Sequence, residues 1–188
     1  MGDNCIRDDA PLKFWLGAFL VKRAALLFSC VLLSLWFGQT ALAHMRTITD
    51  LVGRTLQVPR DPRRIVALAP SITEIVFALG QEHRLKGVSR FSDYPPAANA
   101  YPKVGSYVHL DIERIVALQP DVCIGIKEGN PLAVVKQLDA LKIPVFVVPP
   151  RDMNSVMESI LAIGELLAAT DRAQAVTADM RKRIDAVK

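Results

Sequence analysis

The sequence predicts an α/β fold with a doubly wound parallel sheet, followed by the start of a long helix. Short uninterrupted apolar runs, rich in Val and Ile, indicate strands that are buried on both faces of a sheet. These runs alternate regularly with stretches whose apolar residues recur at helical spacing. Such alternation is typical of a parallel sheet with helices on both faces.

Strands are expected where the apolar runs are short and end at Gly, Pro or a polar residue. The expected strands are residues 47–49 and 55–58, which form a hairpin that turns at Gly53, and then 65–69, 86–89, 103–105, 122–126 and 145–148. A loop is expected over residues 90–102.

Helices are expected where a side chain that can cap a helix precedes apolar residues at helical spacing. Three pairs at capping-box spacing are Ser71 with Glu74, Ser155 with Glu158, and Asp171 with Gln174. The other expected starts are Asp111 and Asn130, the latter followed by Pro at the first helical position. The last apolar stripe runs to residue 188 without a Gly, Asn or Pro, so we expect a chain truncated within a helix.

Residues 1–43 differ in composition from the rest of the chain and indicate a secretory signal peptide. Lys22 and Arg23 precede an uncharged apolar run over residues 24–37, and an A-x-A cleavage pattern ends at Ala43. The run has 14 residues, fewer than the ~20 that a membrane-spanning helix needs. We therefore expect cleavage after Ala43 and export to the periplasm, with a membrane anchor as the alternative. The long segment before the basic pair leaves the true translation start open.

The composition and motifs exclude several classes of protein. A net charge of +4 is too small and too dispersed to indicate nucleic-acid binding. The motifs of serine hydrolases, P-loop nucleotide binders, thiol oxidoreductases and H-E-x-x-H metalloproteases are absent from the sequence. Cys123 lies in an apolar run and is expected to be a buried hydrophobic residue. Nothing in the sequence requires an enzyme, a resident cofactor or a bound metal.

Candidate ligand-binding residues gather near the carboxyl ends of the expected strands, where open parallel sheets bind their ligands. Residues 44–188 contain six aromatic side chains, and four of them fall between residues 91 and 107. Phe91, Tyr94 and Tyr107 therefore indicate a flat, largely apolar ligand surface. For Tyr94 and Tyr101, which adjoin prolines, the alternative is that they only fix the loop.

His109 is the one histidine at this expected edge of the sheet. A single His cannot form a zinc site, which needs three or four ligands. We expect His109 either to form part of a polar rim or to be an axial ligand of a bound metal macrocycle. An exported enzyme or metallochaperone that uses His109 and His83 is the alternative from a different functional class.

Three stretches of the sequence resemble the class III, helical-backbone family of substrate-binding proteins that serve ABC importers. They are residues 64–74 (RIVALAPSITE), 87–96 (GVSRFSDYPP) and 111–121 (DIERIVALQPD). The family includes cobalamin, iron–siderophore and haem binders, and the first and third stretches are shared across it. The loop at residues 92–96 and the Gly129-Asn130 pair resemble its cobalamin-binding branch more narrowly.

The resemblance implies a domain organisation and a function. Residues 44–170 match the N-terminal of two α/β lobes, and residues 171–188 match the start of the backbone helix that joins them. Because the family holds its ligand between the lobes, we expect a non-catalytic periplasmic protein that delivers cobalamin or a related corrinoid to an ABC permease and its ATPase. A ferric siderophore or haem as the ligand, or a truncated lobe that binds nothing by itself, are the alternatives.

The resemblance also implies roles for individual residues. Phe91 occupies the place of a Tyr, and Tyr107 the place of a Trp that lies against the corrin in the cobalamin branch. The expected ligand-binding set is Phe91, Tyr94, Tyr107, His109 and Asn130. Glu113 matches a lobe carboxylate that such proteins offer to arginines of the permease. An acidic residue in the first turn of a helix is also favoured electrostatically.

Overall fold

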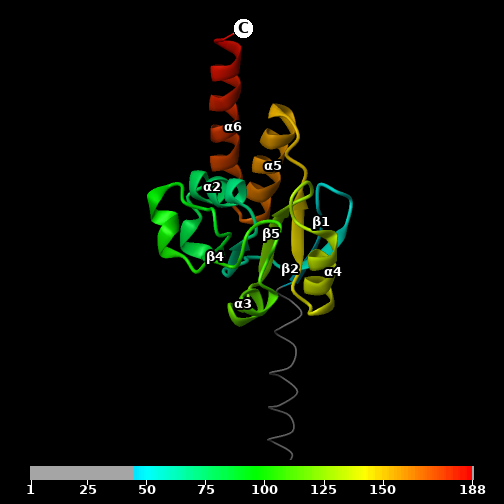
Figure 1. Cartoon of the computed structure of the whole chain (residues 1–188). Helices are drawn as coiled ribbons and strands as arrows, with labels where there is room; N and C mark the ends of the chain where they lie inside the picture. Colours follow the sequence, from blue (N-terminus) through cyan, green and yellow to red (C-terminus); the bar gives the residue numbers. More distant parts are fainter. Residues whose placement is uncertain (1–44, 188) are drawn as a thin grey trace, which may run out of the picture. The chain divides into compact units, whose positions relative to one another are not determined.

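A four-stranded parallel sheet forms the centre of the structure, a computed structural model that describes residues 45–187 (Figure 1). The strand order is β4-β3-β5-β6, and all three neighbouring pairs are parallel. The strands are β3 (Ile65–Ala67), β4 (Leu85–Val88), β5 (Val122–Ile126) and β6 (Val145–Val148). The predicted parallel sheet is therefore confirmed, and four of the expected apolar runs form its strands.

Residues 103–105, which were also predicted as a strand, form only isolated bridges, Lys103 with Val88 and Gly105 with Leu110. The reason lies in the backbone of Gly105, whose φ of +94° is not an extended conformation and ends the strand-like stretch after Lys103 and Val104. The prediction of a full strand there is wrong, because the apolar pattern does not show the turn.

Helices cover both faces of the sheet, and α5 and α6 lie side by side (Figure 1). The helices are α2 (Pro70–Ala78), α3 (Ile112–Ala117), α4 (Leu132–Ala140), α5 (Met153–Leu166) and α6 (Thr170–Asp185), with the short 3-10 helices η2 (Glu82–Arg84) and η3 (Pro96–Ala100). Side chains of α2, α5 and α6 form one apolar core with Ile65 and Ala67. Those of α3 and α4 form a second core with Val66 and Leu68. Successive residues thus serve opposite cores, which makes the sheet doubly wound as predicted.

Two of the predicted capping signals take part in caps. Asp111 caps α3 as predicted, since its side chain accepts a hydrogen bond from the Arg114 N–H (3.0 Å). Ser155 belongs to a capping box that begins three residues earlier than predicted. The Ser155 N–H donates to Asp152 Oδ1 (2.8 Å), and the Asp152 N–H donates to Ser155 Oγ (2.9 Å).

Three other predicted caps are wrong. Ser71 does not cap α2, because the helix already begins at Pro70, whose ring sets the helical φ and which has no N–H to satisfy. Asp171 lies inside α6, which begins one residue earlier and has no side-chain cap. Asn130 does not cap α4, which begins two residues later, because its amide binds other parts of the fold.

An antiparallel hairpin of β1 (Met45–Thr49) and β2 (Thr55–Pro59) is joined to β6 by a buried ion pair. The Asp50 carboxylate is fully buried and accepts hydrogen bonds from Arg54 Nε (3.0 Å) and Nη2 (2.8 Å). The Val147 N–H donates to the same carboxylate (3.3 Å), and Arg54 donates to the Val145 carbonyl. The ion pair therefore satisfies backbone groups on the side of β6 that has no neighbouring strand.

The predicted signal peptide, residues 1–43, lies outside the described residues, and the predicted boundaries at 44–170 and 171–188 stay predictions. Between residues 45 and 187, no helix has the length and apolar character needed to cross a membrane.

We predict that Asp50→Ala lowers the free energy of unfolding by about 3 kcal/mol, because it leaves the Arg54 guanidinium and the Val147 N–H without their buried partner. Urea unfolding followed by circular dichroism measures the change. Asp61→Ala is the control, since Asp61 pairs with arginines at a more exposed site, and a loss below about 1 kcal/mol is expected there. Equal losses in the two variants would contradict the role of the buried pair.

Candidate functional site

The carboxyl ends of the neighbouring strands β3 and β5 mark the point where the order of the strands in the sheet reverses. From β3 the chain continues to β4 on one side, and it then reaches β5 and β6 on the other. Open α/β sheets bind their ligands at such switch points. The segments that follow these strands, residues 68–70 and 127–131, therefore mark the first place to look for a site.

The Asn130 side chain joins three parts of this edge. It is 6% exposed, and its Nδ2 donates hydrogen bonds to the Leu68 carbonyl (3.0 Å) and the Tyr107 carbonyl (2.8 Å). Its Oδ1 accepts a hydrogen bond from the Ile126 N–H at the end of β5 (2.7 Å). Both amide hydrogens are used within the protein. We call these three hydrogen bonds the Asn130 clamp.

Two glycines leave the space that the Asn130 clamp needs. A Cβ atom on Gly125 would lie 2.6 Å from Asn130 Oδ1. A Cβ atom on Gly129 would lie 2.7 Å from Ile126 Cδ1 and 3.1 Å from Cδ2 of the Tyr107 ring. A larger residue would therefore displace the Asn130 amide at position 125, and the Ile126 side chain and the Tyr107 ring at position 129. The Tyr107 ring lies close to the Gly129 backbone.

A tight turn presents Tyr107 and His109. A Cβ atom on Gly105 would clash with the His109 carbonyl oxygen, so the turn requires glycine both for space and for its positive φ. The Asp111 N–H donates to the Val104 carbonyl across the base of the turn (2.9 Å). Both Tyr107 and His109 are exposed.

The loop after β4 places two further aromatic side chains at this end of the sheet. The Arg90 N–H donates to the Gly105 carbonyl (2.7 Å), which joins the loop to the Tyr107 turn. The exposed fractions are 55% for Phe91, 66% for Tyr94 and 38% for Tyr107, so these rings face solvent and not the cores. We call Phe91, Tyr94 and Tyr107 the aromatic edge.

Tyr101 has a structural role, as the alternative for it predicted. Its ring packs edge-on against Phe77, with 6.1 Å between the ring centroids. Its hydroxyl donates to the Glu82 carbonyl (2.8 Å). Burial, and to a lesser extent the charge of Glu82, raises the pKa of Tyr101.

Tyr94, in contrast, borders an apolar hollow of about 350 Å³ between α2, α5 and α6.

The remaining predicted residues differ in their surroundings. Glu113 is exposed in the first turn of α3, and its carboxylate forms no ion pair with the described residues. Cys123 is buried, and this burial raises the pKa of its thiol, as expected for a hydrophobic residue. Within residues 45–187, no cluster of three or more His, Cys, Asp or Glu side chains could hold a metal ion.

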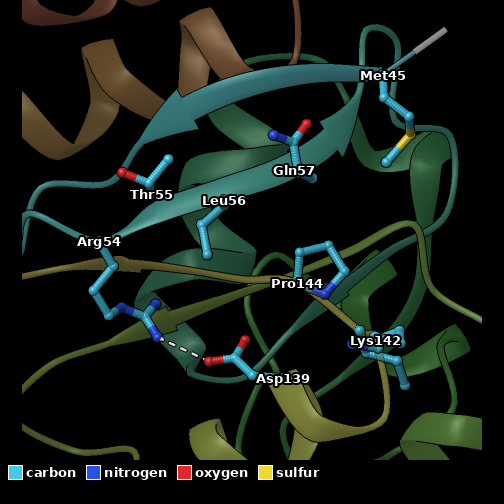
Figure 2. A pocket seen from close by; sticks show the side chains of 9 residues that line it. Met45, Arg54, Thr55, Leu56, Gln57, Asp139, Lys142 and Pro144 are labelled. Carbon is cyan, nitrogen blue, oxygen red and sulfur yellow. Dashed lines mark hydrogen bonds and ion pairs between the residues drawn. The ribbon is translucent and has the colours of Figure 1, made fainter. Parts of the chain in front are cut away.

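A larger hollow of about 600 Å³ lies beside the amino end of β6 and holds none of the predicted ligand residues (Figure 2). Its walls include Arg54 and Asp139, which form an ion pair (3.4 Å), and Lys142. Burial raises the pKa of Asp139, although the Arg54 charge opposes this. Because it has charged walls and no aromatic side chain, this hollow differs in chemistry from the aromatic edge.

Residues 65–188 match the family of periplasmic binding proteins, and this span contains the whole parallel sheet and the aromatic edge. The chain belongs to this family. The relatives that it matches are named as binding proteins and not as enzymes, which agrees with the prediction of a non-catalytic protein.

Several individual relatives match about two thirds of the chain. The vitamin B12-binding protein of Pectobacterium atrosepticum is 32% identical over 123 residues, which are 65% of this chain and 44% of that protein. A periplasmic haem-binding protein from Pseudomonas aeruginosa is 34% identical, with a TM-score of 0.63 over 66% of this chain and 45% of that one. The periplasmic vitamin B12 binding protein of Vibrio cholerae is 31% identical, with a TM-score of 0.63 over 68% and 50%. The chain therefore spans about half the length of the relatives that it matches.

We predict that Asn130→Ala and Gly125→Ala each lower the free energy of unfolding by about 2 kcal/mol, because each breaks the Asn130 clamp. Since both act on the same hydrogen bonds, the double variant is expected to lose clearly less than the sum. Urea unfolding measures all three values. Asn99→Ala is the control, because its amide forms only long, exposed hydrogen bonds. Additive losses would show that the two positions act separately.

Proposed function

We propose that this chain provides the N-terminal ligand-binding lobe of a periplasmic substrate-binding protein, which delivers cobalamin or a related corrinoid to an ABC permease and its ATPase. The observation that carries the proposal is the aromatic edge, three exposed rings on two loops at the carboxyl end of the parallel sheet, joined to each other by the Arg90–Gly105 hydrogen bond. Relatives named for vitamin B12 support the choice of ligand. Location in the periplasm fits both the family and the predicted signal peptide.

A flat macrocycle suits the aromatic edge because stacking buries a large apolar area on rigid side chains. Burial of apolar surface contributes roughly 25 cal/mol per Å² to association before its costs are counted. Those costs fall when the receiving surface is already ordered. The Asn130 clamp and the Arg90–Gly105 hydrogen bond hold both loops in place without a ligand.

The other predicted ligand residues take different parts in this proposal. Asn130 has both amide hydrogens engaged within the protein, so we expect it to act through Tyr107 and not by touching the ligand. His109 is exposed in the same turn as Tyr107. Its imidazole is available either to the polar rim of the ligand or, as an axial ligand, to the metal of a macrocycle.

Haem is the second candidate ligand, and the 34% identity to the haem-binding protein of P. aeruginosa favours it. Haem carries two carboxylates, which require cations beside the aromatic edge. Arg90 and Lys127 are exposed, and their side chains are unpaired within the described residues, whereas Arg151 is paired with Glu128 (3.0 Å). A ferric siderophore with more negative charge would need more cations at the aromatic edge than Arg90 and Lys127 provide.

We also propose that Glu113 docks the lobe onto the permease. Its carboxylate is exposed and has no ion-pair partner among residues 45–187, so it can meet an arginine at no cost in broken contacts. Its place in the first turn of α3 favours the negative charge.

Isothermal titration with cyanocobalamin, and with haemin in parallel, tests the ligand. One lobe covers one face of a macrocycle, so we expect a dissociation constant in the micromolar range or weaker for residues 1–188. Phe91→Ala and Tyr107→Ala are each expected to weaken binding about tenfold, because each removes one stacked ring. Leu141→Ala removes a similarly exposed apolar side chain at the end of α4 and is expected to have no effect.

Three results would change the proposal. Tighter binding of haemin than of cyanocobalamin would transfer the assignment to haem. Submicromolar affinity would contradict a surface built from one lobe. Stoichiometric zinc in protein purified without a His tag would favour a metal-dependent role for His109 and His83.

Charge reversal at the proposed docking residue gives a separate prediction. Glu113→Lys is expected to reduce retention of the chain by its detergent-solubilised permease about tenfold, because attraction between opposite charges becomes repulsion. Glu158→Lys makes the same change in charge at an exposed position of α5 and is expected to be retained like the wild type. Equal retention of both variants would remove Glu113 from the docking surface.

A further inference from the structure

The loop that carries Phe91 and Tyr94 has little regular structure of its own. Residues 89–103 leave β4 and return beside it at Lys103, and η3 is the only helix between these points within the described chain. Two exposed rings on such a loop can offer a defined surface only if other contacts fix its shape.

Three buried hydroxyl groups join this loop to α2. The Oγ atoms of Ser89 and Ser92 lie 2.8 Å apart, and Thr73 Oγ1 donates to Ser92 Oγ (2.9 Å). All three side chains are buried, with exposed fractions of 1% or less. We call them the hydroxyl chain. Because Ser92 follows Phe91 directly, the hydroxyl chain anchors the base of that ring to the first turns of α2.

The Lys103 ammonium contacts the same loop without a carboxylate partner. Its Nζ donates hydrogen bonds to the Ser92 carbonyl (2.6 Å) and the Ala98 carbonyl (3.3 Å), and the residue is half-buried. These two carbonyls lie on either side of Tyr94 in the sequence. Hydrogen bonds from an ammonium group are stronger than those between neutral groups, so Lys103 can hold two points of the loop at a set distance.

Direct recognition of an anionic ligand is a less suitable role for Lys103. Two of its three N–H groups already bind backbone carbonyls, and its side chain is partly covered. Arg90 and Lys127 are fully available for such a contact in the same part of the lobe. The contacts of Lys103 are therefore directed at the loop itself.

We propose that Lys103 and the hydroxyl chain are positioning residues, which hold Phe91 and Tyr94 in the arrangement that a flat ligand meets. Lys103 does not touch the ligand and influences affinity through the two rings. The inference rests on the proposed function for the ligand, but the fixed shape of the loop can be tested without one.

Amide hydrogen exchange of the whole chain, measured by mass spectrometry, tests the loop in the absence of ligand. In Lys103→Met, which keeps the length of the side chain but loses its donors, exchange within residues 90–101 is expected to be about tenfold faster. Lys103→Arg is expected to stay within about twofold of wild type, because it keeps the charge and the donors. Lys136→Met, on the exposed side of α4, is the matched control and is expected to change nothing.

A second variant leaves the charge of the protein unchanged. Ser92→Ala removes the middle hydroxyl of the hydroxyl chain and is expected to accelerate exchange in the same segment. In both variants, exchange in the strands of the parallel sheet is expected to match wild type. Faster exchange across the whole sheet would mean a general loss of stability and would overturn a local positioning role.

Titration with cyanocobalamin tests whether Lys103 acts through the rings. Lys103→Met is expected to weaken binding about tenfold in the wild-type background, but less than about twofold when Phe91→Ala and Tyr94→Ala are already present. A tenfold loss that persists without the rings, or unchanged exchange in Lys103→Met, would overturn the inference. If the wild type binds neither cyanocobalamin nor haemin, the proposed function fails, and the exchange result still decides whether Lys103 fixes the loop.

Discussion

One amide side chain, that of Asn130, holds together the part of the lobe where the ligand is proposed to bind. Without this side chain, three backbone groups would lose a hydrogen-bond partner at the same time: the Leu68 carbonyl, the Tyr107 carbonyl and the Ile126 N–H. The strand ends do not supply these partners to one another: the Leu68 N–H still donates to the Ile124 carbonyl, but beyond it the amide stands between the Leu68 carbonyl and the Ile126 N–H. Gly125 is explained by the same constraint, since a side chain at that position would occupy the space of the amide.

The aromatic edge depends on this clamp by two routes. The turn of Tyr107 is bonded to Asn130 directly, and the Phe91 loop is bonded to that turn through the Gly105 carbonyl. The backbone that carries the exposed rings is therefore fixed by hydrogen bonds. Rings selected for stability alone would lie in one of the two cores, as Phe146 does. Their exposure on ordered loops is what distinguishes this end of the sheet from the rest of the surface.

The sequence predicted the parallel sheet well because burial on both faces leaves a strong pattern in short runs such as 122–126. The aromatic edge could also be predicted, from where its residues fall relative to the strand ends. Contacts between segments that are distant in the sequence could not be predicted. Asn130 looked like a helix cap, but it binds the carbonyl of Leu68, 62 positions away, and no local pattern contains that contact. The hydroxyl chain was missed for the same reason, since Thr73 meets Ser92 only after α2 has packed beside the loop.

The ion pair of Asp50 and Arg54 also has a consequence for the open border of the sheet. A sheet border with open N–H and carbonyl groups is a template for strand addition, from which fibrils and mispaired dimers grow. Here the ion pair occupies the β6 border, and on β4 the backbone of Val88 is bonded to Pro102 and Val104. These hydrogen bonds occupy part of each border of the parallel sheet. Where backbone groups are occupied in this way, contact with another protein depends on side chains, which can discriminate between partners.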